Sequence, residues 1–299
     1  MSPAKSEITR RDFIRGTACA TIALAMGIKA EGQPTKETAK LTRVVLVRDA
    51  GVFDSAGRID PKVIQKMLDD GVATLFQKTV PLDAWKMIAK PNDIVGIKTN
   101  QWEELPTPSE VEQSIKRRVL EAGVPEKQVA IDDRGVLRSE VFRTATTLIN
   151  TRPLRTHAWS GVGGCLKNYI MFSPKPSDYH DNTCANLALL WTLPIVKNKT
   201  KLNVLVMLEP LFHGEGRHHF DKTYTWKYNG LLIGTDPVAL DATGLRIFQA
   251  KRLEYFGEAR PMTPPPHHIA FADTKHHLGV ADAAKIDLIK LGWKEGSLI

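Results

Sequence analysis

The sequence contains only three cysteines in 299 residues, and this scarcity limits the metal chemistry that the chain supports by itself. Cys19, Cys165 and Cys184 lie far apart, and no Cys-x-x-Cys pair is present. Because cysteine thiolates hold most iron–sulfur clusters, no such cluster is expected from this chain. Cys165 and Cys184 are compatible with a disulfide, with two free thiols or with a pair of ligands.

Long apolar runs and basic runs are also lacking. Beyond residue 30, no apolar run reaches the roughly 20 residues that cross a bilayer, so we expect no transmembrane segment. The net charge is +8, and five basic and two acidic residues precede residue 31, which leaves +5 for the rest of the chain. The remaining charges are dispersed, which argues against nucleic acid as a partner and suits a small anionic ligand.

The first 30 residues have the pattern of an export signal. "TRRDFIRG" at 9–16 resembles the twin-arginine motif, with Arg10 and Arg11 at its centre, and the short apolar stretch 16–27 follows. We therefore expect residues 1–30 to be a twin-arginine signal peptide. The expected partner is the twin-arginine export machinery, and the expected location is the periplasm or another exported compartment. The alternatives are an ordinary secretory signal and an amphipathic arm.

Strand and helix patterns alternate after the signal. Short runs rich in β-branched residues predict buried strands at 42–49, 92–100, 127–135 and 201–212. Helices are predicted between them: Asp60 is the expected N-cap of the first, and Thr107 or Ser109 that of a later one. A helix from Asp236 to Gly257 is marked by its N-cap, by Pro237 and by the terminal glycine. This order predicts an α/β fold, a mostly parallel sheet with helices on both faces.

Two segments interrupt the alternation. Residues 151–184 are rich in glycine, proline and polar residues, and we interpret them as an irregular insertion. Residues 223–235 are interpreted as a β-hairpin with its turn near Asn229, and residues 185–196 as a buried helix. The expected organisation is a linker at 31–41 and a single α/β domain at 42–299.

Polar side chains follow two of the predicted strands. Lys98 and Asn100 end the strand at 92–100, and Asp132 and Asp133 end the strand at 127–135. Ligands of open α/β sheets bind beyond the carboxyl ends of the strands, so these four residues are candidate site residues. The alternative for the aspartates is a helix cap or a solvated loop carboxylate.

The glycine-rich insertion supplies further candidates. Gly163 and Gly164 allow a ligand to approach the backbone, Lys167 pairs with a phosphate or a carboxylate, and Asn168 hydrogen-bonds it. The segment "YHDNTC" adds His180 and Cys184, which are compatible with a Cys–His nucleophile. Asp133, Lys167 and His180 are the candidate catalytic residues.

A histidine-rich loop at 213–221 is the candidate metal site. His213, Glu215 and His218 are residue types that hold zinc or iron, although their spacing matches no strong metal signature. The alternative is a solvent-exposed loop without metal. Asp241 shares the apolar stripe of its helix, where a carboxylate needs a partner, so it is either a structural anchor or a group that faces the site.

The order of motifs resembles domain-of-unknown-function family 362 over residues 42–280. The strongest marks are "GCLKNYIMF" and "LLIGTDPVALDATGLRIFQAKR", together with "DIVGIKTN", "YHDNTC" and "KLNVLVMLEPLFHGEG". The resemblance implies the α/β fold and the site positions Lys98, Asn100, Lys167, Asn168, His180, Cys184, Asp236 and Asp241. Some relatives carry an iron–sulfur module, whose cysteines are absent here. The family largely lacks an assigned activity, so the resemblance implies no reaction.

Three functions compete on these grounds. The first is an exported enzyme that acts on a small anionic substrate or cofactor, with redox or metal-assisted chemistry. The second is an envelope protein that binds an anion or a divalent metal without turnover, and the third is a structural accessory protein. A convergence of Asp133, His180 and His213 on one spot supports the first two. The third predicts no such convergence.

Overall fold

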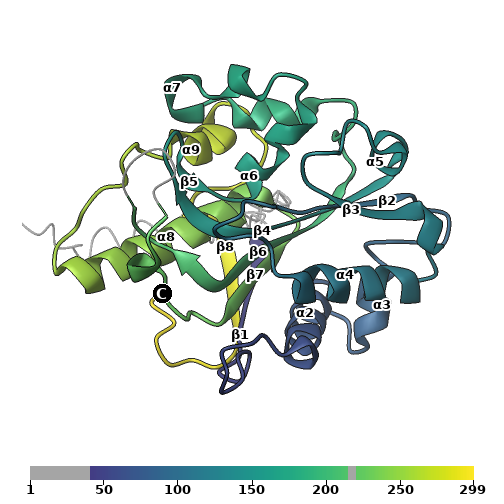
Figure 1. Ribbon diagram of the computed structural model, residues 1–299, viewed down its shortest axis with the longest axis horizontal. Coiled ribbons are helices and arrows are strands. Elements are labelled where there is room, and N and C mark those ends of the chain that lie inside the picture. Colours follow the sequence, from purple (N-terminus) through teal and green to yellow (C-terminus); the bar gives the residue numbers. More distant parts are fainter. Residues whose placement is uncertain (1–40, 215–219) are drawn as a thin grey trace, which may run out of the picture. The chain divides into compact units, whose positions relative to one another are not determined.

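The computed structural model describes residues 41–214 and 220–299, and the fold is that of this part of the chain. Its sheet runs in the order β3-β2-β4-β6-β7-β1-β8, with β5 paired to β4 (Figure 1). The strands are β1 (Thr42–Arg48), β2 (Val95–Lys98), β3 (Val129–Asp132), β4 (Thr147–His157), β5 (Gly161–Gly163), β6 (Thr200–Leu211), β7 (Gly230–Gly234) and β8 (Ile286–Gly292).

Helices lie on both faces of this sheet. They are α2 (Pro61–Leu75), α3 (Pro81–Trp85), α4 (Ser109–Glu121), α5 (Glu140–Thr144), α6 (Cys165–Asn168), α7 (Asp181–Cys184), α8 (Pro237–Phe256) and α9 (His267–Thr274). Short 3-10 helices occupy Glu126–Gln128, Tyr169–Phe172, Pro176–Tyr179, Leu187–Thr192, Lys222–Tyr224 and Ala283–Lys285. The fold is therefore α/β, as the alternating patterns predict.

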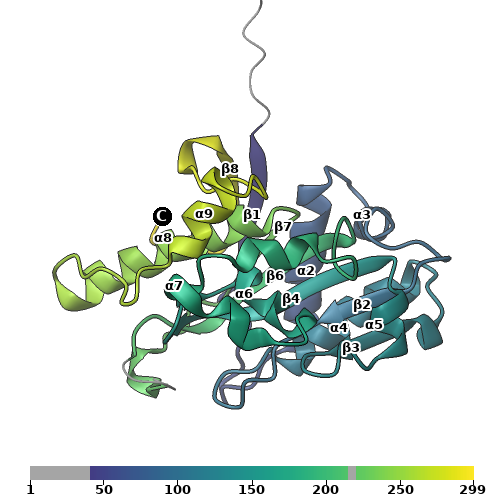
Figure 2. The same cartoon turned by 90° about the horizontal axis from the view of Figure 1, so that it is seen from above.

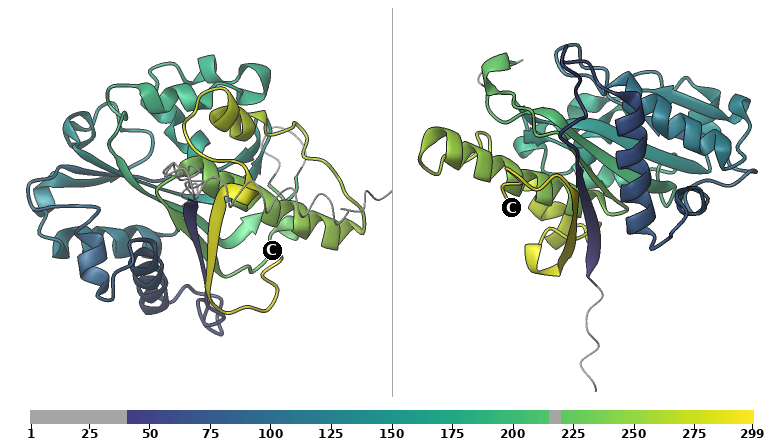
Figure 3. Two further views of the ribbon diagram at one scale, coloured as in Figure 1. Left: turned by 180° about the vertical axis from the view of Figure 1, so that it is seen from behind. Right: turned by 90° about the horizontal axis from the view of Figure 1, so that it is seen from below.

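Each face of the sheet has its own apolar core. On one face, α2, α3 and α4 cover side chains such as Val45, Ile97 and Val204. On the other, α6, α8 and α9 enclose a second cluster that includes Leu154 and Leu205. Figure 2 shows the domain from above, and in Figure 3 α2 (dark blue) and α8 (yellow-green) lie on opposite sides of the sheet.

The longest helices begin and end where the sequence predicts. The Asp60 side chain accepts from Lys62 N at 2.7 Å, and Asp236 caps α8 through Val238 N at 2.8 Å. Such caps contribute about 1 kcal/mol each. Gly257 ends α8 in the left-handed conformation, φ 72°. For α4 the predicted cap by Thr107 or Ser109 is wrong, because Pro108 holds the cap position without a side-chain hydrogen bond.

The segment predicted to be irregular contains the central strand of the site. β4 runs through Pro153, a residue that usually stays out of central strands. The parallel pairing with β6 shifts register between Pro153 and Arg155, and this irregularity accommodates the missing N–H. The prediction of irregular structure over residues 151–157 is therefore wrong. From Gly164 to Cys184 the chain does form only short helical turns.

Two further expectations differ in detail. β7 pairs antiparallel with β6 on one side and with β1 on the other, not with residues 223–228, so the hairpin of β6 and β7 has a long connection from Phe212 to Asn229. Residues 187–192 form a 3-10 helix where a longer buried helix is predicted, because Leu193 returns to an extended conformation.

Candidate functional site

A row of polar side chains crosses the centre of the sheet at one level. Lys98 of β2 lies opposite Asp132 of β3 and Asn150 of β4, and Asn150 lies opposite Asn203 of β6. Asn150 Nδ2 donates to Asn203 Oδ1 at 2.9 Å, and Asn168 of α6 donates to Asn150 Oδ1 at 2.8 Å. Lys98, Asn150 and Asn203 have no exposed surface, so each amide depends on the next for a partner.

Lys98 and Asp133 form the buried ion pair of the site. Lys98 Nζ donates to Asp133 Oδ1 at 2.5 Å and to Thr99 O at 2.6 Å. Asp133 Oδ2 accepts the backbone N–H of Gln101 at 2.9 Å. Burial lowers the pKa of Lys98 to about 8, although Asp133 acts in the opposite direction. Neither charge is left without a partner, which a buried pair requires.

A pocket of about 140 Å³ lies beyond the carboxyl ends of β2 and β3. It is lined by Asn100, Trp102, Asp133, Arg134, Arg152, Arg155, His157, Lys167, Asn168, Ile170 and Met171. β2 ends opposite Asn150, whereas β4 continues to His157 and forms one wall of the pocket with this extension. The position agrees with the rule that open α/β sheets bind ligands at the carboxyl ends of their strands.

Two arginines of the β4 extension are buried at the pocket. Arg152 is 1% exposed, and its Nη2 has no hydrogen-bond partner among the described residues. Arg155 stacks on the Trp102 ring at 3.9 Å, and its Nε likewise has no partner in the described part of the chain. Burial lowers the pKa of both guanidinium groups, which marks the cost of holding these charges away from water.

Lys167 reaches the same pocket from α6, which Asp241 holds in place. Asp241 Oδ1 and Oδ2 accept the N–H groups of Cys165 and Leu166 at 2.6 and 2.9 Å. A Cβ at Gly164 would lie 2.2 Å from Asp241 Oδ1, so only glycine allows this approach. Asp241 is thus an anchor for the residues that carry Lys167. Burial raises its pKa to about 7, and the two N–H groups oppose the shift.

Cys184 and His180 lie on the far side of Lys167. Lys167 Nζ donates to Cys184 Sγ at 3.4 Å, and the ring of His180 packs at a tilt against Trp159 with centroids 4.2 Å apart. Cys165 and Cys184 are both buried and free, so of the three alternatives for this pair the disulfide is excluded. Burial raises the pKa of Cys184, and Lys167 partly offsets that effect.

A left-handed turn places Cys184 next to Lys167. Asn182, Thr183 and Cys184 have φ values of 46°, 55° and 62°. Each left-handed non-glycine residue costs about 1–2 kcal/mol, so packing around the turn must offset this strain. Backbone strain of this kind gathers at functional sites, and here it lies beside a buried amine.

Three histidines around Lys167 are held neutral. Burial, followed by the charge of Lys167, lowers the pKa of His157 far below its usual range and that of His180 to about 4. His268 of α9 is fully buried, neither ring nitrogen has a partner among the described residues, and its pKa is lowered to about 3. The cationic surroundings therefore disfavour any further positive charge.

His213, the predicted metal residue that the structure describes, lies apart from this site. His213 Nδ1 lies 2.9 Å from Arg252 Nη1, and its ring packs edge-on against Tyr224 and Phe256. Glu215 and His218 lie outside the described residues. Over residues 41–214 and 220–299, no three His, Cys, Asp or Glu side chains gather as metal ligands would.

The other candidates divide between the pocket and its support. Asn100, Asp133, Lys167 and Asn168 line the pocket directly. Asp132 instead accepts the N–H of Gly135 at 2.8 Å and shapes the loop after β3.

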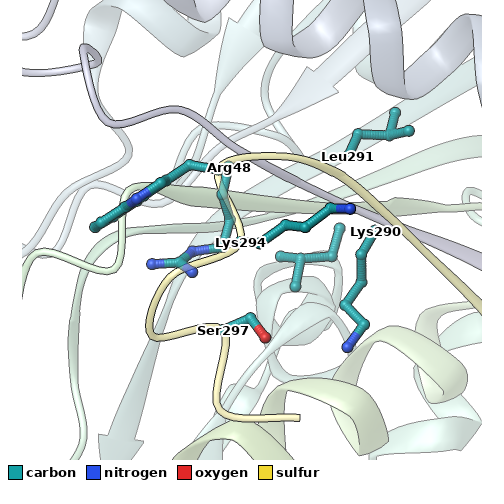
Figure 4. A pocket seen from close by; sticks show the side chains of 7 residues that line it. Arg48, Lys290, Leu291, Lys294 and Ser297 are labelled. Carbon is teal, nitrogen blue, oxygen red and sulfur yellow. The ribbon is translucent and has the colours of Figure 1, made fainter.

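A second basic pocket, of about 310 Å³, lies where β1 and β8 meet (Figure 4). Its Arg48 is stacked between the rings of Tyr228 and Trp293 and donates to Tyr228 O at 2.8 Å. Lys290 donates to the main-chain oxygen of Ile299 at 2.5 Å. Because its arginine is already used to hold the segment after β8, we interpret this pocket as structural.

Four further site residues were not predicted from the sequence: Asn150, Arg152, Arg155 and His157, all on β4. The strand-end rule that identified Lys98 and Asp133 would have pointed to Arg155 and His157, had residues 147–157 been assigned to a strand. The apolar start of this strand, Leu148 and Ile149, was the available signal. No transmembrane helix was expected, and no helix of the described part has the length and apolarity to cross a bilayer.

Comparison with known proteins identifies a family but no characterised relative. No curated protein and no solved structure matches the chain. The family described as Domain of unknown function (DUF362) matches residues 95–246, which span β2 to the middle of α8 and include every residue of the polar row and the pocket. The resemblance noted over residues 42–280 is thus confirmed over residues 95–246, and the chain belongs to the DUF362 family.

Proposed function

We propose that this protein is an exported enzyme that binds a small anionic substrate in the pocket at the ends of β2, β3 and β4. The observation that carries the proposal is the excess of buried positive charge there. Arg152, Arg155 and Lys167 are each at most 9% exposed. The acidic residue of the pocket lining, Asp133, is already paired with Lys98.

This excess is costly without an anion. Removing one ion from water costs several kcal/mol even after the protein relaxes, and a buried donor without an acceptor adds about 1–3 kcal/mol. Arg152 Nη2 and Arg155 Nε both lack acceptors among the described residues. Guanidinium groups match the two oxygens of a carboxylate or a phosphate, so a bound oxyanion supplies the missing acceptors and the missing charge.

Catalysis, rather than capture alone, is supported by the titratable groups around the pocket. Lys98, Lys167, His157 and His180 all have pKa values displaced from their usual range by burial and neighbouring charge. Such groups concentrate where proton transfer or nucleophilic attack takes place. Asp133 and Lys167 border the pocket and are the proposed catalytic residues. The third proposed catalytic residue is His180, which lies near Lys167 but does not line the pocket.

Export rests on the sequence of residues 9–16. The two arginines, Phe13 and the following apolar stretch support recognition by the twin-arginine machinery, and hence a periplasmic or other exported location. Replacing Arg10 and Arg11 together with lysine should retain the protein in the cytoplasm, as measured by cell fractionation. Export of the double variant at the wild-type level would contradict this part of the proposal.

Anion binding is tested by isothermal titration calorimetry of the purified chain with phosphate, sulfate and pyruvate, against chloride at the same ionic strength. We expect at least one oxyanion to bind to wild type at a single site. Arg155→Gln should weaken that binding at least tenfold, about 1.4 kcal/mol, because one charged pair is lost.

The matched control is Lys290→Gln, which removes one positive charge from the other basic pocket. Its affinity should equal that of wild type, because Lys290 lies outside the proposed site. If no oxyanion binds, or if Lys290→Gln weakens binding as much as Arg155→Gln, the positive charge of the whole protein is responsible and the proposed site is wrong.

A further inference from the structure

Lys98 and Lys167 are both buried at the site, yet their side-chain nitrogens have different surroundings. Lys98 Nζ donates to a carboxylate and to a backbone carbonyl at 2.5 and 2.6 Å, with Asn168 Oδ1 at 3.4 Å. Lys167 Nζ has one hydrogen-bond partner among the described residues, the sulfur of Cys184 at 3.4 Å. A thiol is a weak acceptor. The amine of Lys167 is therefore not committed to an ion pair.

Burial and the neighbouring arginines favour the neutral form of Lys167. Together the surroundings lower its pKa to about 8: burial is the main cause, Cys184 opposes the shift, and Arg152 and Arg155 add to it. At pH 7 about a tenth of such an amine is unprotonated, against roughly 0.04% of an ordinary lysine. A neutral lysine beside cationic groups is the arrangement that activates an amine for attack on a carbonyl.

The pocket combines this amine with sites for one carboxylate. Lys167, Arg152 and Arg155 line the same pocket, and both arginines have N–H groups without acceptors in the described part of the chain. The pocket volume of about 140 Å³ has room for a molecule of several non-hydrogen atoms, since roughly 10–15 Å³ of such a volume holds one water. A small 2-oxo acid has this size and carries a carboxylate next to its carbonyl carbon.

We propose that Lys167 forms a Schiff base with the carbonyl carbon of a small 2-oxo acid whose carboxylate is held by Arg152 and Arg155. The proposal rests on the proposed function, since it names the substrate class for the same pocket. Inorganic phosphate is the competing ligand, because it would pair with the protonated form of Lys167 and leave the amine unreactive.

The step balances without an oxidant or a reductant. The neutral Nζ attacks the carbonyl carbon, a C–N bond forms, and the π electrons of the carbonyl move to oxygen, which takes up the proton that the nitrogen loses. A second proton, from solvent, protonates the hydroxyl, and the nitrogen lone pair forms the C=N bond as the C–O bond breaks and water leaves. The product is a protonated imine, whose positive charge lies beside the bound carboxylate and draws electrons from the neighbouring carbon.

The test is reductive trapping. The purified chain is incubated with pyruvate or glyoxylate, treated with sodium borohydride and analysed by peptide mass spectrometry. We expect a reduced adduct on Lys167 whose yield increases as the pH is raised from 6 to about 8, because the neutral amine becomes more abundant. Phosphate at high concentration should suppress the adduct by competing for the arginines.

Two variants separate this inference from the anion site itself. Lys167→Arg keeps the positive charge but has no nucleophilic amine, so it should bind pyruvate within a few-fold of wild type and give no adduct at residue 167. Lys175→Arg, at an exposed position of the following segment, should trap as wild type does. Binding of pyruvate by calorimetry without an adduct on Lys167, or adducts on surface lysines alone, would overturn the Schiff base and leave the anion site standing.

Discussion

Replacing Arg152 with methionine should make the protein more stable in the absence of an anion and should weaken its binding of the anion. Methionine has a similar length and no charge, so it fills the space of the buried side chain without the need for hydrogen bonds. Arg152 is 1% exposed, and its one hydrogen bond within the described part of the chain runs from Nε to Pro153 O at 3.3 Å. The substitution therefore removes an under-satisfied charge from the interior.

The expected change in the free energy of unfolding is worked out separately for the anion-free and the anion-bound protein. Without an anion, the substitution removes an unsatisfied donor, worth about 1–3 kcal/mol, and the desolvation of a charge. It also removes the attraction of Arg152 to Asp241 and Asp133. These carboxylates keep other partners, two N–H groups for Asp241 and Lys98 for Asp133. We therefore expect the free energy of unfolding to rise by about 1–3 kcal/mol.

A bound anion offsets this difference. An anion at 100 times its dissociation constant stabilises wild type by about 2.7 kcal/mol. Loss of one charged pair in a buried site costs about 2–5 kcal/mol of binding, so the variant should gain less than about 1 kcal/mol at the same concentration. Urea denaturation with and without the oxyanion identified by calorimetry measures both effects.

The control for this experiment is Arg117→Met on the exposed side of α4. It removes the same charge from the surface, and its response to the anion should match that of wild type. Our reasoning would be refuted by an Arg152→Met protein that is less stable than wild type without anion. It would also be refuted if this variant kept the full stabilisation by the anion.

Three further outcomes test the supporting structure. Asp241→Asn should lower the free energy of unfolding, measured in urea, by about 2–4 kcal/mol, because the new amide turns a donor toward a buried N–H. An unchanged midpoint of urea denaturation would show that Asp241 does not anchor α6. Gly164→Ala should be destabilising by more than 1 kcal/mol, since its Cβ would meet Asp241 at 2.2 Å, whereas Gly57→Ala meets no atom within 4 Å and is disfavoured only by its φ of 76°. The pKa of His268 is about 3 in the folded protein and near 6.5 in the unfolded chain, so between these values the unfolded chain binds the extra proton. The free energy of unfolding therefore falls as the pH drops from 6.5 towards 3, by up to about 1.4 kcal/mol per pH unit. His268→Leu should lose this pH dependence of the free energy of unfolding between pH 7 and 5. If the stability of the variant fell as steeply as that of wild type, His268 would not be its cause.

The sequence predicted the elements whose ends carry local signals. Asp60 and Asp236 cap their helices, and Gly257 ends α8, because such signals act over a few residues and need no tertiary context. β4 was missed for the opposite reason. Pro153 and two arginines contradict the pattern of a buried strand, and only the neighbours β2 and β6 make this segment the centre of the sheet.

The site shows the same division. Lys98, Asp133, Lys167 and Asn168 were identified from strand ends and from the glycine pair, and the structure brings them together. The role of Asp241 was left between an anchor and a site group. Its contact with Cys165 N joins residues 76 positions apart, and spacing along a helix cannot reveal such a contact.

Burial alone does not separate structural groups from chemical ones in this site. Lys98 and Lys167 are both buried, and burial lowers the pKa of each to about 8. The ammonium of Lys98 is matched by the carboxylate of Asp133, and this ion pair holds β2 to the loop after β3. Lys167 faces a thiol and two arginines instead. Because its neighbours do not compensate its charge, either a bound anion must do so or the proton must leave, and both outcomes make Lys167 the reactive lysine of the pair.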